Sequence, residues 1–178
     1  MAGRPRSLPR RSGRGRARLT GLERVAGSIS IIAVSRGSRS PLDDWTAEIL
    51  TRAQRFARID LARIPPSRER RAKDRLERES AALLTRLERA GTVVALDSRG
   101  VASDSVRFAD RLESWRRAGA PTFVVGGPDG LGDATRERAD ALLSFGPMTL
   151  PHELALAVLA EQLYRALSAD VGHPYGRH

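Results

Sequence analysis

Two short segments of this chain have the residue types that bring a protein backbone close to a small ligand. The first is residues 123–130 (FVVGGPDG), in which Gly126 and Gly127 directly follow a hydrophobic run. A glycine has no Cβ, so a ligand can approach the backbone there. Taken alone, however, the pair is more typical of a tight turn between a strand and a helix. Neither G-x-G-x-x-G nor a G-K-[ST] ending is present, which excludes the two common phosphate-binding motifs.

The second segment is residues 146–152 (GPMTLPH), where Pro147 and Pro151 flank a stretch that carries no charge. Such a loop is stiff. Its backbone groups can therefore recognise an adenine without a large loss of conformational entropy on binding. Pro151 is also typical of the first turn of a helix. The two interpretations are compatible with each other.

The C-terminal end carries side chains suited to RNA. His173, Tyr175, Arg177 and His178 lie within six residues, and Arg165 precedes them in a helical pattern. Aromatic rings stack on bases and arginines contact phosphates. Chain ends are usually frayed, however, so these residue types leave the role of the tail open. The chain has no cysteine and no G-x-S-x-G motif, which argues against a covalent nucleophile.

The hydrophobic pattern of the sequence predicts the strands and helices that would position these segments. Strands are expected at 29–34, 59–64, 92–96, 121–125 and 142–145, and helices near 45–56, 67–90, 103–119, 130–141 and 151–167. This alternation predicts an α/β fold with a parallel sheet, in which ligands bind beyond the carboxyl ends of the strands. The site should therefore form from the loops after Leu96, Val125 and Phe145. The helix at 153–167 is apolar nearly all round, which predicts a buried helix that also forms a subunit interface.

The charge of the chain is unevenly distributed. The net charge is +10, and residues 1–27 contribute +7 through eight arginines and one glutamate. We interpret this segment as a disordered basic arm, or as a start codon placed too early, ahead of one domain at 28–178. A basic arm favours a polyanionic partner such as nucleic acid. The composition indicates no metal centre, no membrane span and no secretion signal, which favours a cytoplasmic protein.

Five motifs occur in the order that is typical of one family. They are residues 96–100 (LDSRG), 123–131 (FVVGGPDGL), 148–152 (MTLPH), 161–166 (EQLYRA) and 173–175 (HPY). Together they resemble the ribosomal RNA large subunit methyltransferase H family over residues 28–178. The resemblance implies a SPOUT-type α/β fold, with helices on both faces of a parallel sheet and a C-terminal trefoil knot, in a homodimer. It also implies S-adenosylmethionine as cofactor and methylation at N3 of pseudouridine 1915 in the 23S rRNA of assembled ribosomes.

The resemblance assigns roles to individual residues. Those expected to hold the cofactor are Leu96, Gly127, Gly146, Pro147, Met148, Thr149, Leu150 and Pro151. Those expected on the substrate side are Arg165, His173, Tyr175 and Arg177, with His152 as a further candidate. The chain departs from the family pattern at Gly176, where a histidine is usual. This departure keeps two alternatives open: an RNA-binding protein that has lost the chemistry, and a SPOUT enzyme that acts on another RNA.

Overall fold

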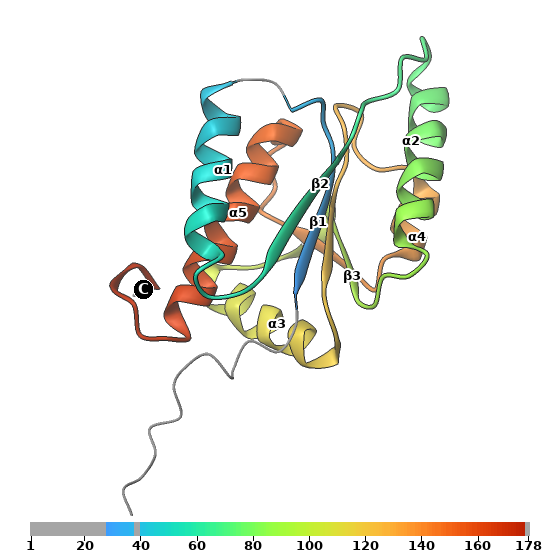
Figure 1. Cartoon of the computed structure of the whole chain (residues 1–178). Helices are drawn as coiled ribbons and strands as arrows, with labels where there is room; N and C mark the ends of the chain where they lie inside the picture. The colour runs from blue at the N-terminus through green and yellow to red at the C-terminus, as the bar shows by residue number, and fades with distance from the viewer. Residues whose placement is uncertain (1–27, 38–39, 177–178) are drawn as a thin grey trace, which may run out of the picture.

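The computed structural model describes residues 28–37 and 40–176; the arm at 1–27, Arg177 and His178 lie outside the described residues. Within these described residues, five strands alternate with five helices (Figure 1). The strands are β1 (Ile29–Val34), β2 (Ile59–Ile64), β3 (Val93–Ala102), β4 (Thr122–Val125) and β5 (Ala141–Ser144). The helices are α1 (Pro41–Ala53), α2 (Ala72–Leu87), α3 (Ser105–Ala118), α4 (Asp133–Arg138) and α5 (His152–Ala169), followed by a 3₁₀ turn, η1 (Pro174–Gly176).

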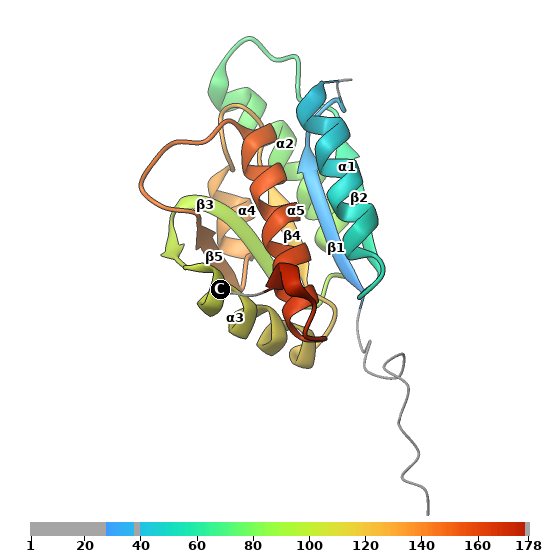
Figure 2. The same ribbon diagram turned by 90° about the vertical axis from the view of Figure 1, so that its left-hand side faces the viewer.

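The strands form one parallel sheet in the order β2-β1-β4-β3-β5. Strands buried on both faces read as continuous hydrophobic runs, which is why β1 and β4 are recognisable in the sequence. Helices α1, α3 and α5 cover one face, and α2 and α4 cover the other (Figures 1 and 2). The predicted α/β fold with helices on both faces is confirmed.

Successive side chains along a strand point to opposite faces of the sheet, so each strand contributes to two separate cores. In β1, Ile31 packs in the core under α1, α3 and α5, whereas Ile32 packs in the core under α2. In β4, Phe123 and Val124 divide in the same way. The first core is the larger one, because it receives most of the apolar surface of α5, including the fully buried Leu159.

Several element boundaries differ from the sequence prediction; α1, for example, begins at Pro41 rather than near residue 45. Helix α2 begins at Ala72 rather than near residue 67, and the Glu79 side chain accepts a hydrogen bond from the backbone N–H of Ser67 (2.9 Å) in the preceding extended segment. Helix α4 has only six residues. Strand β3 continues to Ala102 instead of ending at Leu96, with a shift in its pairing to β5 between Leu96 and Val101. The loop expected after Leu96 is thus an irregular strand.

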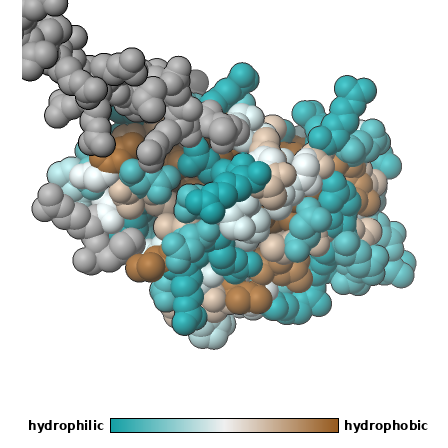
Figure 3. All heavy atoms as spheres, turned by 90° about the horizontal axis from the view of Figure 1, so that it is seen from below, coloured by the Kyte–Doolittle hydropathy of each residue, from teal (hydrophilic) through white to brown (hydrophobic). Residues whose placement is uncertain are grey.

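Figure 3 shows the end of the sheet at which the strands begin. The end seen from below in Figure 3 shows hydrophilic side chains interleaved with scattered hydrophobic ones, without a broad apolar face. The carboxyl ends of the strands lie at the opposite end. There the chain leaves β5 in a long excursion before it enters α5 (Figure 2). A ligand site is therefore expected at the carboxyl end.

Candidate active site

A cavity of about 640 Å³ opens at the carboxyl ends of β3, β4 and β5. This volume lies within the range of small-molecule sites, roughly 300–1,000 Å³. All of the predicted cofactor residues except Pro147 line it: Leu96, Gly127, Gly146, Met148, Thr149, Leu150 and Pro151. His152 also lines the cavity. The structure thus brings together three segments that are far apart in the sequence.

The Gly126–Gly127 segment forms a tight turn with no spare volume. A Cβ on Gly126 would lie 2.3 Å from the carbonyl oxygen of Gly130, and a Cβ on Gly127 would lie 3.0 Å from Glu79 Oε2 and from a methyl group of Val34. The N–H of Gly130 donates to the carbonyl of Gly127 at 2.9 Å and closes the turn. The tight-turn interpretation is confirmed, and the cavity is lined by the bare backbone of that same turn.

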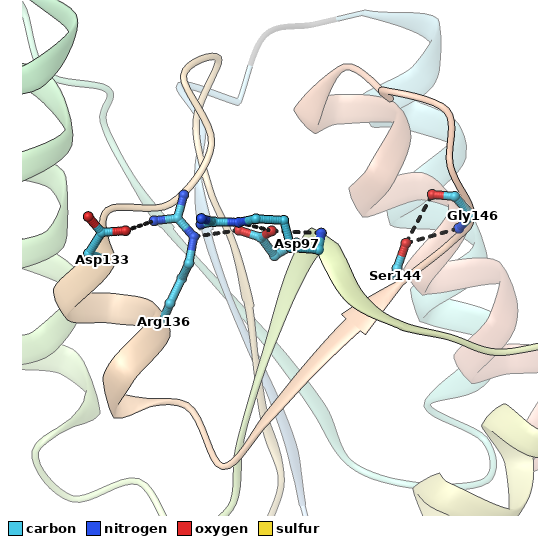
Figure 4. A network of polar contacts seen from close by, with 6 residues as sticks. Asp97, Asp133, Arg136, Ser144 and Gly146 are labelled. Atoms are coloured by element: carbon cyan, nitrogen blue, oxygen red, sulfur yellow. Dashed lines mark hydrogen bonds and ion pairs between the residues drawn. The ribbon is translucent and has the colours of Figure 1, made fainter.

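The loop between β5 and α5 is fixed at its first residue. Gly146 has a φ of 121°, a conformation that favours glycine. The buried Ser144 hydroxyl donates to the Gly146 carbonyl at 3.0 Å and accepts from the Gly146 N–H at 3.1 Å (Figure 4). Further along, Met148 is 76% exposed beside the cavity. The loop therefore has a rigid base and an exposed apolar tip.

Arg165 and Tyr175, two of the predicted substrate-side residues, form a separate cluster on α5 and η1. Glu161 Oε1 accepts hydrogen bonds from Arg165 Nε (2.9 Å), Arg165 Nη2 (2.6 Å) and the Tyr175 hydroxyl (3.1 Å). The Arg165 guanidinium also lies over the Tyr175 ring, 4.9 Å from its centroid. Burial, followed by the hydrogen bond to Glu161, raises the pKa of the Tyr175 phenol above its ordinary value. Glu161 stands four residues before Arg165 on the helix, but the sequence carries no signal that Glu161 is the common acceptor of both side chains.

The tail packs against α5 in the described residues. The Tyr175 ring lies 4.6 Å from that of Tyr164, and the His173 ring lies 5.9 Å from that of Phe56. Gly176 is buried, and a Cβ there would lie 2.4 Å from the Ala169 backbone. A larger residue at position 176 would force the tail to move. None of Arg165, His173 and Tyr175 lines the cavity, so one chain does not join the two groups of predicted site residues.

Comparison with known proteins decides the family. The family described as "Predicted SPOUT methyltransferase" matches residues 28–176. The chain belongs to this SPOUT methyltransferase family. It is 40% identical over 157 residues to the ribosomal RNA large subunit methyltransferase H of Methylobacterium sp. (strain 4-46), covering 84% of this chain and 97% of that protein. It is 46% identical over 150 residues to the protein of the same name from Acidiphilium cryptum, covering 84% and 93%.

The fold agrees with a solved structure as well. A probable methyltransferase from Bordetella pertussis Tohama I superposes with a TM-score of 0.51 at 17% identity, over 83% of this chain and 98% of that one. The resemblance to the ribosomal RNA large subunit methyltransferase H family is confirmed by the relatives. The SPOUT methyltransferase described here is an enzyme that takes its methyl group from S-adenosylmethionine.

The cavity of this SPOUT methyltransferase fits such a cofactor. S-adenosylmethionine combines a flat adenine, a ribose and a charged amino-acid end, and it supplies an activated methyl group when bound. The loops rich in Gly and Pro line this cavity with backbone groups. Asp97 and Arg136 supply charged side chains elsewhere in the wall. The sequence analysis did not single out Arg136, because one arginine in a short charged helix has no distinguishing pattern.

Within residues 28–37 and 40–176, no group of three or more His, Cys, Asp or Glu side chains is arranged to hold a metal ion. In the same part of the chain, no helix has the length and apolar character needed to cross a membrane.

Proposed function

We propose that the protein methylates N3 of pseudouridine 1915 in 23S rRNA, in the cytoplasm, on assembled ribosomes. The observation that carries the proposal is that relatives named ribosomal RNA large subunit methyltransferase H align over 93–97% of their own length. The cavity and the cluster of Tyr175 and Arg165 support it. The cavity would hold the cofactor, and the cluster brings together an arginine and an aromatic residue, the residue types that contact phosphates and bases in RNA.

Methyl transfer requires the protein mainly to position the two reactants. Transfer of a methyl group from a sulfonium to a ring nitrogen is an in-line displacement that needs no covalent intermediate with the enzyme. Holding the two reactants in line then supplies most of the rate acceleration. The N3 proton must also leave, and a basic neighbourhood stabilises the resulting anion. We assign positioning to the cavity loops and assign contact with the base to His173, Tyr175, Arg165 and Arg177, of which Arg177 lies outside the described residues.

We further propose that the protein is a homodimer with a trefoil knot in its C-terminal part. In one chain the cavity and the cluster on α5 are separate. A complete site is then assembled when the tail of one subunit meets the cavity of the other. Leu154 of α5 is 37% exposed and Met148 is 76% exposed, which supplies apolar surface for such an interface.

The substrate is tested with purified protein and S-adenosylmethionine carrying a labelled methyl group. The acceptors to compare are assembled ribosomes, protein-free 23S rRNA and bulk tRNA, each from cells that lack the enzyme. We expect label in assembled ribosomes, at N3 of a single pseudouridine. Label in tRNA alone would support a SPOUT enzyme of different target. Binding to ribosomes without transfer of label would support an RNA-binding protein that has lost the chemistry.

A further inference from the structure

Two arginines in the cavity wall share one buried carboxylate. The Asp97 side chain, on β3, is 8% exposed. Its Oδ2 accepts from Arg136 Nε at 2.6 Å, and its Oδ1 accepts from the Arg99 N–H at 2.9 Å and from Arg99 Nε at 3.2 Å. All three residues line the cavity. One buried carboxylate thus holds two arginine guanidiniums at the cavity wall.

The guanidinium of Arg136 is held in place from two sides. Its Nη1 donates to Asp133 Oδ1 at 2.8 Å while its Nε donates to Asp97, so carboxylates from α4 and from β3 fix its plane (Figure 4). Asp133 is 85% exposed, and water therefore screens most of its charge. Within the described part of the chain, Arg136 Nη2 has no hydrogen-bond partner, and the Arg136 side chain is 21% exposed. An oriented donor that needs no rearrangement favours binding of a carboxylate or phosphate oxygen.

S-adenosylmethionine has a single anionic group, the carboxylate of its amino-acid end. We propose that Arg136, held by Asp97 and Asp133, binds that carboxylate. The inference rests on the cofactor and not on the identity of the RNA target. Arg136 is the less exposed of the two arginines, whereas the Arg99 side chain is 59% exposed and contributes charge at the mouth of the cavity. An RNA phosphate is the other possible source of such an oxygen, and the experiment below distinguishes the two.

The test compares two ligands that differ only at this end. S-adenosylhomocysteine carries the amino-acid group, and 5′-methylthioadenosine lacks it. Their affinities are measured by calorimetry for the wild type, Arg136→Gln and Arg138→Gln. Arg138 is the matched control, because it lies on the same helix, donates to the carbonyls of Leu87 and Ala90, and does not line the cavity.

We expect Arg136→Gln to bind S-adenosylhomocysteine about tenfold to a hundredfold more weakly, as expected for loss of a charge-assisted hydrogen bond. The same variant should bind 5′-methylthioadenosine as the wild type does, which also shows that its cavity is intact. Arg138→Gln should match the wild type for both ligands. Asp97→Asn should act in the same direction as Arg136→Gln, with a smaller loss, because it frees the guanidinium that Asp97 holds.

Two results would overturn the inference. Unchanged affinity of Arg136→Gln for S-adenosylhomocysteine would mean that the carboxylate binds elsewhere; a loss of ribosome binding in that variant would then assign Arg136 to an RNA phosphate. An equal loss of affinity for both ligands would mean that Arg136 only maintains the shape of the cavity. Because the calorimetric measurements use no RNA acceptor, they stand apart from a failure of the proposed rRNA target.

Discussion

The backbone at Gly127 is enclosed by the protein itself. Glu79 lies beneath it with a side chain that is almost fully buried, and Val34 lies alongside. The Glu79 carboxylate is held by its burial and by the hydrogen bond that its Oε1 accepts from the Ser67 N–H (2.9 Å), so it cannot move aside without losing that bond. The turn that lines the cavity is therefore sensitive to any added volume, even though the substituted atoms would point away from the ligand.

Gly127→Val should weaken cofactor binding at least tenfold. The new side chain collides with Glu79 and Val34, and overpacking of this kind costs about 1–3 kcal/mol, which the turn relieves by shifting. Calorimetry with S-adenosylhomocysteine measures the effect. Gly91→Ala is the control, since a Cβ there meets only the Ala120 carbonyl at an ordinary 3.7 Å. Equal affinity of Gly127→Val and the wild type would show that the turn does not define the cofactor site.

Tyr175 should make the stability of the protein sensitive to alkaline pH. Burial and Glu161 raise its pKa above the ordinary value of 10.0, so folding favours the neutral phenol. The resulting stabilisation is fully present below the ordinary pKa and is lost as the pH rises through the higher pKa of the folded state. Urea unfolding from neutral pH to above pH 10 should therefore show a steeper alkaline loss for the wild type than for Tyr175→Phe. Parallel curves would mean that the phenol is not held neutral by the fold.

Helix α5 combines a buried side with a partly open one. Leu159 is fully buried in the larger core, whereas Leu154 is 37% exposed. The sequence predicted a helix apolar nearly all round, and this pattern alone did not separate residues that pack within the chain from residues that meet a partner. The exposed fractions of Leu154 and Leu159 make that distinction, and a substitution at each residue tests the proposed interface.

Leu154→Glu should convert the dimer into folded monomers, because it places a charge on the exposed apolar surface without disturbing the core. Leu159→Glu should unfold the chain, because it buries a charge without a partner. Sedimentation at micromolar concentration, with circular dichroism as the check on folding, separates the two outcomes. A wild type that sediments as a monomer, or a Leu154→Glu variant that stays dimeric, would argue against an interface at this surface.

The elements best predicted from the sequence are those with a local hydrophobic pattern. Strands β1 and β2 were predicted with their observed bounds: β1 is an almost continuous buried hydrophobic run, and β2, at an edge of the sheet, places Ile at both ends and Leu61 between them. Helix α3 is capped by Asp104, a residue type favoured at helix N-termini, whose side chain accepts from the N–H of Arg107 at 2.7 Å.

The misplaced boundaries depend on contacts between distant residues. The start of α2 follows from the contact between Glu79 and Ser67, and the extension of β3 follows from its pairing with β5. The cofactor loops were identified through the family resemblance, whereas the Asp97–Arg136 pair joins residues 39 positions apart and has no local signal. The position of the tail beside α5 rather than the cavity was likewise not readable from spacing.

At the scale of the whole molecule, two incomplete subunits should complement each other. One variant lacks residues 173–178, and the other carries Gly127→Val. Each should be inactive alone, while their mixed dimer pairs an intact cavity with an intact tail. Random exchange of subunits should restore about a quarter of the wild-type activity on ribosomes. The truncated variant should still bind S-adenosylhomocysteine, which verifies its fold. If mixing restores no activity, the tail does not serve the partner's cavity.

The rRNA target is the central claim, and mass spectrometry of 23S rRNA from a strain without the gene tests it most directly. The nucleotide at position 1915 should lose 14 mass units, as expected for a missing methyl group on pseudouridine, and the methyl group should return when the wild-type gene is supplied. A gene carrying Gly127→Val should fail to restore it. An rRNA whose position 1915 has the same mass with and without the gene would contradict the account.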